Sequence, residues 1–551
     1  MNIYLFLLSI ITLILYISCK DDVDFYQPGT DIYTPISTKN GNILGKKVFS
    51  NDKSHWEFLG IPYAEPPIGN LRFKAPVPVK PLSDVFEAFN DGNVCMQPRS
   101  PFIPSEAEIS EDCLTLNIFT NNINISHPIP VMVWIHGGGF IGGSKDRYRM
   151  QTLIDQDVIL VTINYRLHAL GFISFGNNLV SGNMGLKDQH LAIMWVKQNI
   201  HNFGGNADQI TIFGESSGGQ SVQAHVLSPY NSDLLYGAIA QSGSILYLSV
   251  ETPGIEKKYA KNAAKALGCS DTLDQETLDC LQNVDAADFV KKVSDPDEIQ
   301  FDPINEVKFS YFPIVDDYAD EPFLPFDPLF ALKTGTFNKI PFITGTVENE
   351  GVTVNRFHGV YGAEGMDAVE AIMVPAQSGI FISLTYGQDD VFRRVALNFY
   401  NHSSGASLFE QEKPAIDFTT DTQYLSYDQK SAELMSKHVN SVYNFYFTQK
   451  TNRSGIGQWL DLPIEYTPVH GDDEEFLVSI ESFEDMVGVA DDEKETAMKM
   501  VKYWTNFAKN GSPNTDEDDD LLHWNEVGNE KVELINVLLI FQYIIFRIIW
   551  N

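Results

Sequence analysis

The chain has 551 residues, of which 44% are hydrophobic and 20% are charged, a composition that is typical of a globular protein and excludes a disordered or fibrous one. Its 73 acidic and 38 basic residues give a net charge of −35, which argues against nucleic acid or an anionic membrane surface as a partner. The acidic excess either keeps the protein soluble or attracts a cationic substrate.

The amino-terminal segment, residues 1–19, predicts a secretory signal peptide. It is mostly apolar from Ile3 onward and is followed by the charged run Lys20-Asp21-Asp22. An uncleaved anchor stays an alternative, because the segment has no early Lys or Arg and no clear small-residue cleavage site. We expect a secreted, extracellular protein with one domain at residues 20–535, because no linker or repeat divides the chain there.

The cysteines and the glycosylation sequons agree with secretion. In an oxidising compartment Cys95 with Cys113, and Cys269 with Cys280, would pair most simply, although four cysteines allow three connectivities. Their spacing matches no zinc site. Three sequons predict glycosylation, at Asn124, Asn401 and Asn452.

Alternating strand and helix patterns indicate the fold class. Helical spacing of apolar residues appears at 188–200 and at 492–510, where Gly511 and Pro513 end the helix. Together with the strands, these helices predict an α/β fold with a mostly parallel central sheet covered by helices on both faces. Short β-branched or apolar runs predict buried strands at residues 130–135, 158–164, 209–213, 237–240 and 341–345.

A glycine-rich loop follows the predicted strand 130–135. It reads His136-Gly137-Gly138-Gly139, and loops of this type supply backbone N–H groups that stabilise the oxyanion of a tetrahedral intermediate. We expect donors at Gly138 and Gly139, with a third at Ser217. Three consecutive glycines after a buried strand argue against an ordinary flexible turn.

Residues 209–219 have the pattern of a nucleophile elbow. The predicted strand runs directly into GESSGG (214–219), which contains the motif G-x-S-x-G, and residues 217–227 can continue as a helix. Such a turn places the serine on strained backbone at the end of a strand, and the glycines leave room for the bend. The motif is weak alone, but its context favours Ser216 as the nucleophile of an α/β-hydrolase.

A serine hydroxyl needs a base to take its proton, and in this fold the base follows the nucleophile in the chain. Among the downstream histidines, His470 lies with Gly471 in a predicted loop, where catalytic groups are usually mounted. His402 falls in a sequon and His438 falls on a predicted helix. Spacing alone leaves the choice of base open.

The sequence resembles the type-B carboxylesterase and cholinesterase family over about residues 40–535. The resemblance implies an α/β-hydrolase fold and a serine esterase activity. The matching motifs lie in register along the chain: FLGIPYA (58–64), LRF (71–73), EDCLTLN (111–117), NYR (164–166), GNMGLKDQ (182–189), FGGN (203–206) and WTNFAKNGSP (504–513).

The resemblance also implies the catalytic residues. GTVENEG (345–351) is similar to the family's acid loop, which implies Glu350 as the acid, and the segment from His470 to Phe476 is similar to its histidine loop. In this scheme His470 accepts the proton of Ser216 and later gives it to the leaving alcohol, while Glu350 fixes the imidazole tautomer. The triad and the backbone donors suffice for ester hydrolysis, so we expect no cofactor and no metal.

Other matches imply mainly structural roles. Arg72 with Glu111, and Arg166 with Asp188, resemble internal ion pairs of the family. Both cysteine pairs match its disulfide loops. Glu215 is similar to a residue of the pocket floor, where it would either support the structure or favour a cationic ligand.

Two departures from the family pattern argue against a choline ester as the substrate. A cholinesterase carries, between its first two mature cysteines, a tryptophan that stacks on the quaternary ammonium, whereas residues 96–112 contain no Trp or Tyr. The segment Val352-Thr353-Val354 lacks the aromatic residue expected after the acid. We therefore expect the carboxylesterase branch, and an enzyme that hydrolyses small-molecule carboxylic esters through an acyl-enzyme.

Two further functions stay open. An esterase dedicated to a hormone ester, or a lipase of the same family, would use the same residues. A non-catalytic adhesion or ligand-sequestering protein can share the fold, but the intact Ser216, Glu350 and His470 argue against it.

The remaining segments are acidic or apolar. Residues 472–475 and 516–520 are predicted to be solvated acidic loops. Residues 536–551 form an apolar tail too short for a typical transmembrane helix, which leaves a docked strand, a membrane-associating tail or an incorrect gene end as alternatives. Any membrane contact would come only through this tail, and the oligomeric state stays open.

Overall fold

The computed structural model describes residues 32–50, 53–100, 103–250, 254–294, 311–357, 407–478, 489–515 and 520–528. The predicted signal segment, the sequon at Asn401, the apolar tail and the domain boundary at residue 535 lie outside these residues. Within them, no helix is long and apolar enough to cross a membrane.

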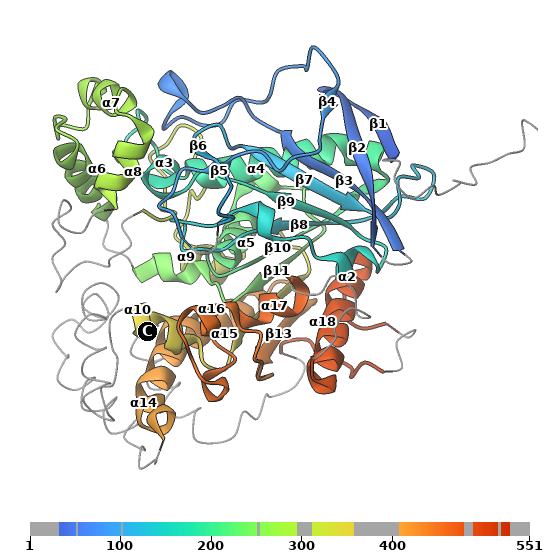
Figure 1. The fold of residues 1–551 in the computed structure, drawn as a ribbon. Coiled ribbons are helices and arrows are strands. Elements are labelled where there is room, and N and C mark those ends of the chain that lie inside the picture. The colour runs from blue at the N-terminus through green and yellow to red at the C-terminus, as the bar shows by residue number, and fades with distance from the viewer. Residues whose placement is uncertain are drawn as a thin grey trace, which may run out of the picture.

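An 11-stranded sheet forms the centre of the fold (Figure 1). Its order is β1-β2-β3-β7-β9-β8-β10-β11-β12-β13, with β4 paired to β2, and a separate two-stranded sheet joins β5 to β6. The strands are β1 (Ile32–Thr38), β2 (Gly41–Ser50), β3 (Lys53–Pro62), β4 (Phe86–Glu87), β5 (Val94–Cys95), β6 (Ile109–Ser110), β7 (Thr115–Thr120), β8 (Ile129–Ile135), β9 (Ile159–Ile163), β10 (Gly205–Glu215), β11 (Gly237–Gln241), β12 (Phe342–Val347) and β13 (Val442–Phe447).

The strand directions agree with the predicted sheet in its central part. From β9 through β8, β10, β11 and β12 to β13, every neighbouring pair is parallel. The pairs that join β1, β2, β3, β7 and β9 are antiparallel. The five predicted strands are β8 to β12, so the mostly parallel sheet is confirmed, whereas the amino-terminal antiparallel strands were not predicted.

Side chains of the central strands alternate between two hydrophobic cores. In β8, Val131 and Val133 belong to one core, which contains apolar residues of α4 and α5. Met132 and Trp134 belong to the other core, which contains apolar residues of α18. Because successive side chains of a strand point to opposite faces, both faces of the sheet are covered by helices, as predicted.

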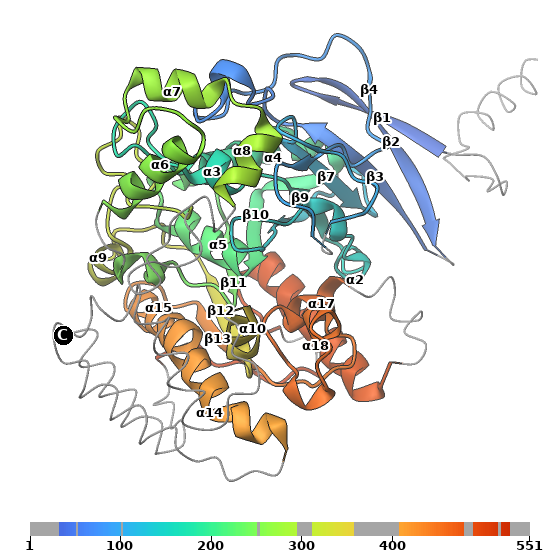
Figure 2. The ribbon, with the colours of Figure 1, turned by 60° about the vertical axis from the view of Figure 1, so that its left-hand side comes forward.

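Helices surround the sheet in both views, with α6, α7 and α8 clustered toward the top and α14 toward the bottom (Figures 1 and 2). The short turns that matter below are η2 (Lys145–Arg147), a 3-10 turn, and η7 (Asp421–Leu425), a π-helix. The described α-helices are α2 (Gln151–Ile154), α3 (His168–Phe172), α4 (Met184–Asn199), α5 (Ser217–Leu227), α6 (Ile255–Ala266), α7 (Gln275–Gln282), α8 (Ala286–Val293), α9 (Pro328–Thr334), α10 (Glu350–Phe357), α14 (Leu408–Thr420), α15 (Ser426–Ser436), α16 (Gly455–Trp459), α17 (Asp472–Val478) and α18 (Asp491–Asn510).

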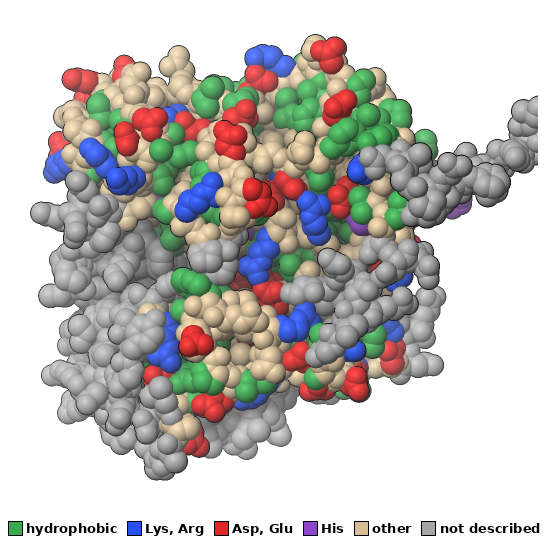
Figure 3. All heavy atoms as spheres, viewed as in Figure 1, with side chains coloured by type: hydrophobic (Ala, Val, Ile, Leu, Met, Phe, Trp, Pro, Cys, Tyr) green, Lys and Arg blue, Asp and Glu red, His purple; other side chains and the backbone are tan. Residues whose placement is uncertain are grey.

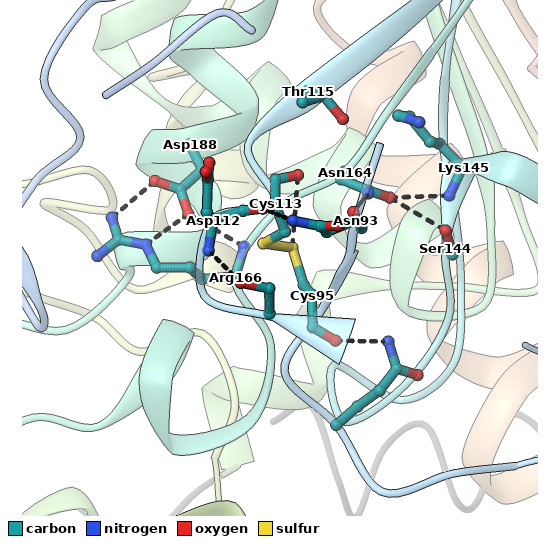
Figure 4. Close-up of a disulfide and its surroundings, with 12 residues drawn as sticks. Asn93, Cys95, Asp112, Cys113, Thr115, Ser144, Lys145, Asn164, Arg166 and Asp188 are labelled. Atoms are coloured by element: carbon teal, nitrogen blue, oxygen red, sulfur yellow. Dashed lines mark hydrogen bonds and ion pairs between the residues drawn. A yellow bond between two sulfur atoms is a disulfide. The ribbon is translucent and has the colours of Figure 1, made fainter. Parts of the chain in front are cut away.

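Covalent and ionic links expected from the sequence are present. The carboxylate of Asp188 accepts two hydrogen bonds of 2.7 Å from the side chain of Arg166, close to the first disulfide (Figure 4). Arg72 and Glu111 form a second ion pair, with an N–O distance of 2.6 Å. Both predicted disulfides form, Cys95–Cys113 and Cys269–Cys280.

The acidic run at residues 472–475 is the first part of α17, and the prediction of a solvated loop was wrong. All four carboxyl side chains are buried. Carboxylates are stabilised in the first turn of a helix, and here groups outside the helix also contact them. The partners include the Val469 amide, the Gln241 side chain and the Arg147 guanidinium. The other acidic run lies largely outside the described residues, apart from the exposed Asp520.

Candidate active site

Ser216 stands at the turn between β10 and α5. Its backbone has φ 57° and ψ −123°, a sparsely populated conformation for a residue with a side chain. A Cβ atom on Gly218 would lie 2.0 Å from the carbonyl oxygen of Ile135, and one on Gly214 would lie 2.5 Å from the same atom. The predicted strand–turn–helix is therefore present, and only glycine fits at these two positions.

Two loops bring Glu350 and His470 together. Glu350 begins α10, three residues after β12 ends, and His470 directly precedes the turn into α17. The two segments run side by side as an isolated parallel bridge between Asn349 and Val469. The Asn349 amide donates to the carbonyl oxygen of Pro468 at 3.1 Å. This bridge places the acid beside the histidine although 120 positions separate them.

The three side chains form one hydrogen-bonded series. His470 Nδ1 lies 2.6 Å from Glu350 Oε2, and His470 Nε2 lies 2.8 Å from Ser216 Oγ. Glu350 is fully buried, and its Oε1 accepts a 2.9 Å hydrogen bond from the Val347 amide. Because an ionised carboxylate only accepts, His470 must carry a proton on Nδ1, which leaves Nε2 of the neutral ring free to accept the serine proton.

The glycine loop lies against the nucleophile. A Cβ atom on Gly137 would lie 3.1 Å from the Cβ atom of Ser216. Gly138 has φ +106°, and a Cβ there would lie 2.2 Å from the carbonyl oxygen of Gly142. Outside the helices and strands of the described residues, no backbone–backbone hydrogen bond is donated by the amides of Gly138 or Gly139, and Ser217 is the first residue of α5, where an amide has no partner within the helix. The glycine loop thus lies beside Ser216, and the role of Gly138, Gly139 and Ser217 as oxyanion donors stays a prediction.

The charges around His470 favour its protonated form. Burial acts to lower the pKa of His470, but the nearby carboxylates of Glu215 and Glu350 outweigh it, so the pKa is raised. Glu215 Oε1 lies 3.3 Å from His470 Nε2. Burial also raises the pKa of Glu215 well above its usual value. The protonation of Glu215 and that of His470 therefore depend on each other.

The carboxyl groups of α17 extend this acidic surrounding. Burial raises the pKa of Asp473 to about 6 and that of Glu474 to about 8, and the charge of Arg147 partly opposes the second shift. Burial raises the pKa of Asp472 to about 7. Several carboxyl groups near the histidine can consequently hold protons at neutral pH.

Two residues near the site were missed by the sequence analysis. Tyr424, in the π-helix η7, places its ring 5.1 Å from the His470 ring. Arg147, in η2, pairs with Glu475 in α17. Neither segment carried a recognisable signal, because a π-helix has no distinct sequence pattern and the ion pair joins residues 328 positions apart.

A further downstream histidine and the predicted glycosylation sites have other surroundings. His225 is buried in α5, hydrogen-bonded to the side chains of Gln189 and Asn231. Asn124 and Asn452 are exposed, as a glycosylation site requires, and their glycosylation stays a prediction.

Comparisons with known proteins identify what the chain is similar to. The Carboxylesterase family matches residues 33–541. Juvenile hormone esterase of Tribolium castaneum is 31% identical over 538 residues, which cover 94% of this chain and 89% of that protein. Acetylcholinesterase of Electrophorus electricus is 30% identical over 540 residues, covering 89% and 82%. Venom carboxylesterase-6 of Apis mellifera is 31% identical over 504 residues, covering 88% and 86%.

Proposed function

This chain belongs to the carboxylesterase family and is a carboxylic ester hydrolase, and from that premise we propose that it acts through an acyl-enzyme formed on Ser216. The observation that carries the proposal is the series of two hydrogen bonds from Glu350 through His470 to Ser216. This is the arrangement that activates a serine for nucleophilic attack.

In the acylation step, Ser216 Oγ attacks the ester carbonyl carbon while His470 Nε2 accepts the serine proton. The carboxylate of Glu350 stabilises the imidazolium that forms. The amides of Gly138, Gly139 and Ser217 donate to the oxyanion of the tetrahedral intermediate. The intermediate collapses when His470 gives its proton to the leaving alcohol.

Water repeats the sequence in the deacylation step. His470 takes a proton from the water as its oxygen attacks the acyl carbon, and the proton then returns to Ser216 Oγ. The carboxylic acid leaves and the free serine is restored. Backbone donors and three side chains carry the whole cycle, so it requires no cofactor and no metal.

We propose an uncharged ester rather than a choline ester as the substrate class. The buried residues Val352 and Thr353, next to the acid, offer no aromatic face to a quaternary ammonium. On the face shown in Figure 3, Lys and Arg side chains lie among Asp and Glu and interrupt the acidic charge. A hormone ester or a lipid would use the same site, and the intact triad disfavours a purely binding protein.

The proposal includes an extracellular location and one domain at residues 20–535. Two disulfides support an oxidising compartment, because such bonds rarely persist in the cytosol. The asparagine side chains of the sequons at Asn124 and Asn452 are exposed, which supports glycosylation. Membrane contact would come through the apolar tail at residues 536–551.

The test compares the protein with a Ser216→Ala variant on p-nitrophenyl butyrate. Removing the nucleophile of such a triad lowers kcat by about 10⁶-fold, so nitrophenolate release should fall to the background. A fluorophosphonate should label Ser216 in the unsubstituted protein, as mass spectrometry of the peptide would show. Turnover that survives in a folded Ser216→Ala variant would refute the acyl-enzyme.

A further inference from the structure

Arg147 links the segment that follows the glycine loop to α17, the helix that follows His470. It ends the short turn η2, eight residues after Gly139 in the chain. Its side chain reaches α17, the helix that begins two residues after His470. The side chain is 28% exposed, whereas the carboxylates it meets are 8% and 9% exposed. Arg147 therefore extends from the rim of the protein toward buried acidic groups.

Arg147 contacts two buried carboxyl groups of α17. Its Nη2 forms an ion pair with Glu475 Oε1 and lies 3.8 Å from Glu474 Oε1. The Tyr148 hydroxyl donates to Glu474 Oε2 at 3.5 Å. Arg453 Nη2 donates to the backbone carbonyl oxygen of Glu475 at 3.3 Å. Removing Arg147 would leave two buried carboxyl groups without this cation, which is costly in a low-dielectric setting.

The same carboxyl groups belong to the surroundings of the catalytic histidine. The negative charge of Asp473 acts to raise the pKa of His470, and the positive charge of His470 acts to lower the pKa of Glu474. The titratable groups that face this region come from several elements: Glu215 of β10, Glu350 of α10, Tyr424 of η7, Asp472, Asp473, Glu474 and Glu475 of α17, and Tyr148 after η2. Most of them are acids, and Arg147 supplies positive charge to the cluster.

We propose that Arg147 is a positioning residue for His470, which holds α17 through Glu475 and Glu474 and limits the negative charge acting on the imidazole. The inference rests on the proposed function, in which His470 must be neutral to accept the serine proton. An acidic cluster without this cation binds protons more tightly. His470 would then stay protonated to higher pH, and less enzyme would be active at neutral pH.

The test compares Arg147→Met with Arg147→Lys. Methionine keeps much of the side-chain volume and removes the charge, while lysine keeps the charge and loses the planar guanidinium group. Loss of a positive charge from the acidic cluster favours the protonated imidazole, so Arg147→Met should raise the proton affinity of His470 between about three- and tenfold. Arg147→Lys should recover most of this change.

Two measurements read the effect. The proton affinity of His470 is measured by NMR titration of protein labelled with ¹⁵N-histidine, with the signal assigned from a His470→Gln variant. The acid limb of kcat/KM on p-nitrophenyl butyrate should move to higher pH by the same factor, while KM should change less than about twofold, because in this proposal Arg147 acts on the histidine and not on the substrate.

Arg149→Met is the matched control. Arg149 lies two residues further along the chain, is 42% exposed, and pairs with Glu57 and Asp91 rather than with α17. Its loss should leave the titration of His470 unchanged. An equal shift in both variants would show a general charge effect and overturn the role of Arg147.

A double variant distinguishes the effect of the lost positive charge on His470 from an effect on folding. Arg147→Met combined with Glu475→Gln removes both members of the closer ion pair and leaves only Glu474 without the cation, so the proton affinity of His470 should return part of the way toward the original value. A folded Arg147→Met protein with an unaltered His470 titration would refute the proposal. Because NMR needs no turnover, absent esterase activity with a shifted titration would contradict the proposed function instead.

Discussion

At the scale of single residues, the proposed role of Glu350 depends on one carboxylate oxygen that fixes the tautomer of His470. Glu350 is fully buried and accepts a hydrogen bond of 2.6 Å from His470 Nδ1. In Glu350→Gln the amide can donate to Nδ1, which stabilises the wrong tautomer, so we expect kcat to fall about 10³- to 10⁴-fold. The measurement is p-nitrophenyl butyrate hydrolysis, with circular dichroism as the control for folding. A decrease of less than tenfold would contradict the role of the acid.

Glu215 should set the acid limb of the pH profile. Its carboxylate, 3.3 Å from His470 Nε2, raises the pKa of the histidine, and a raised pKa keeps His470 protonated and inactive at low pH. Glu215→Gln removes this charge, so the pKa of His470 should fall and the acid limb of kcat/KM should move to lower pH. A profile recorded from pH 4 to 9 checks the direction, and an acid limb displaced upward would show that Glu215 acts otherwise.

At the scale of elements, the glycine loop depends on backbone that a side chain would block. Gly138 has φ +106°, and an added Cβ would meet the Gly142 carbonyl at 2.2 Å. Gly138→Ala should displace an oxyanion donor, and loss of one donor costs about 10²- to 10³-fold in kcat. Gly69→Ala is the control, because Gly69 also has positive φ but no heavy atom within 4 Å of its Cβ position. Comparable activity of the two variants would rule out the proposed donor.

The sequence pattern of α17 did not predict that this segment is a buried helix. Its four consecutive acids resemble a solvated loop, since such a run rarely enters a core. They are buried because the chain reverses at Gly471 and the Val469 amide, Gln241 and Arg147 converge on them. Two of these partners lie more than 200 positions away, so no local pattern could reveal them.

At the scale of the whole molecule, one disulfide is coupled to the site. Gln97, two residues after Cys95, exchanges two 2.8 Å hydrogen bonds with the backbone of Gly143, four residues after the glycine loop. Cys95→Ser with Cys113→Ser should lower the free energy of unfolding by about 3 kcal/mol, because the reduced chain gains conformational freedom. We also expect several-fold lower kcat, measured on p-nitrophenyl butyrate.

The second disulfide provides the comparison. Cys269–Cys280 spans 11 positions, and its removal should cost a similar amount, about 3 kcal/mol, by urea denaturation. It joins the segment after α6 to α7, and neither helix carries a residue of the proposed triad, so kcat should stay unchanged. Equal losses of kcat in both double variants would show that Cys95–Cys113 has no special connection to the glycine loop.

The sequence alone determined the elements whose signals are local. Apolar runs predicted β8 to β12, the turn GESSGG predicted the strained Ser216, and Gly511 with Pro513 marked the end of α18. Resemblance to a family, rather than local physics, singled out Glu350 and His470. Local signals are readable because a strand, a tight turn and a helix stop each depend on residues a few positions apart.

Only the tertiary structure decided which distant groups meet. The bridge between Asn349 and Val469 aligns the acid with the histidine, and the packing of η7 and η2 brings Tyr424 and Arg147 to the same region. The burial of α17, and with it the raised pKa of Glu474, also arises from this packing. Burial and pair distances depend on the whole fold, so the proton affinities that control the chemistry cannot be obtained from sequence spacing.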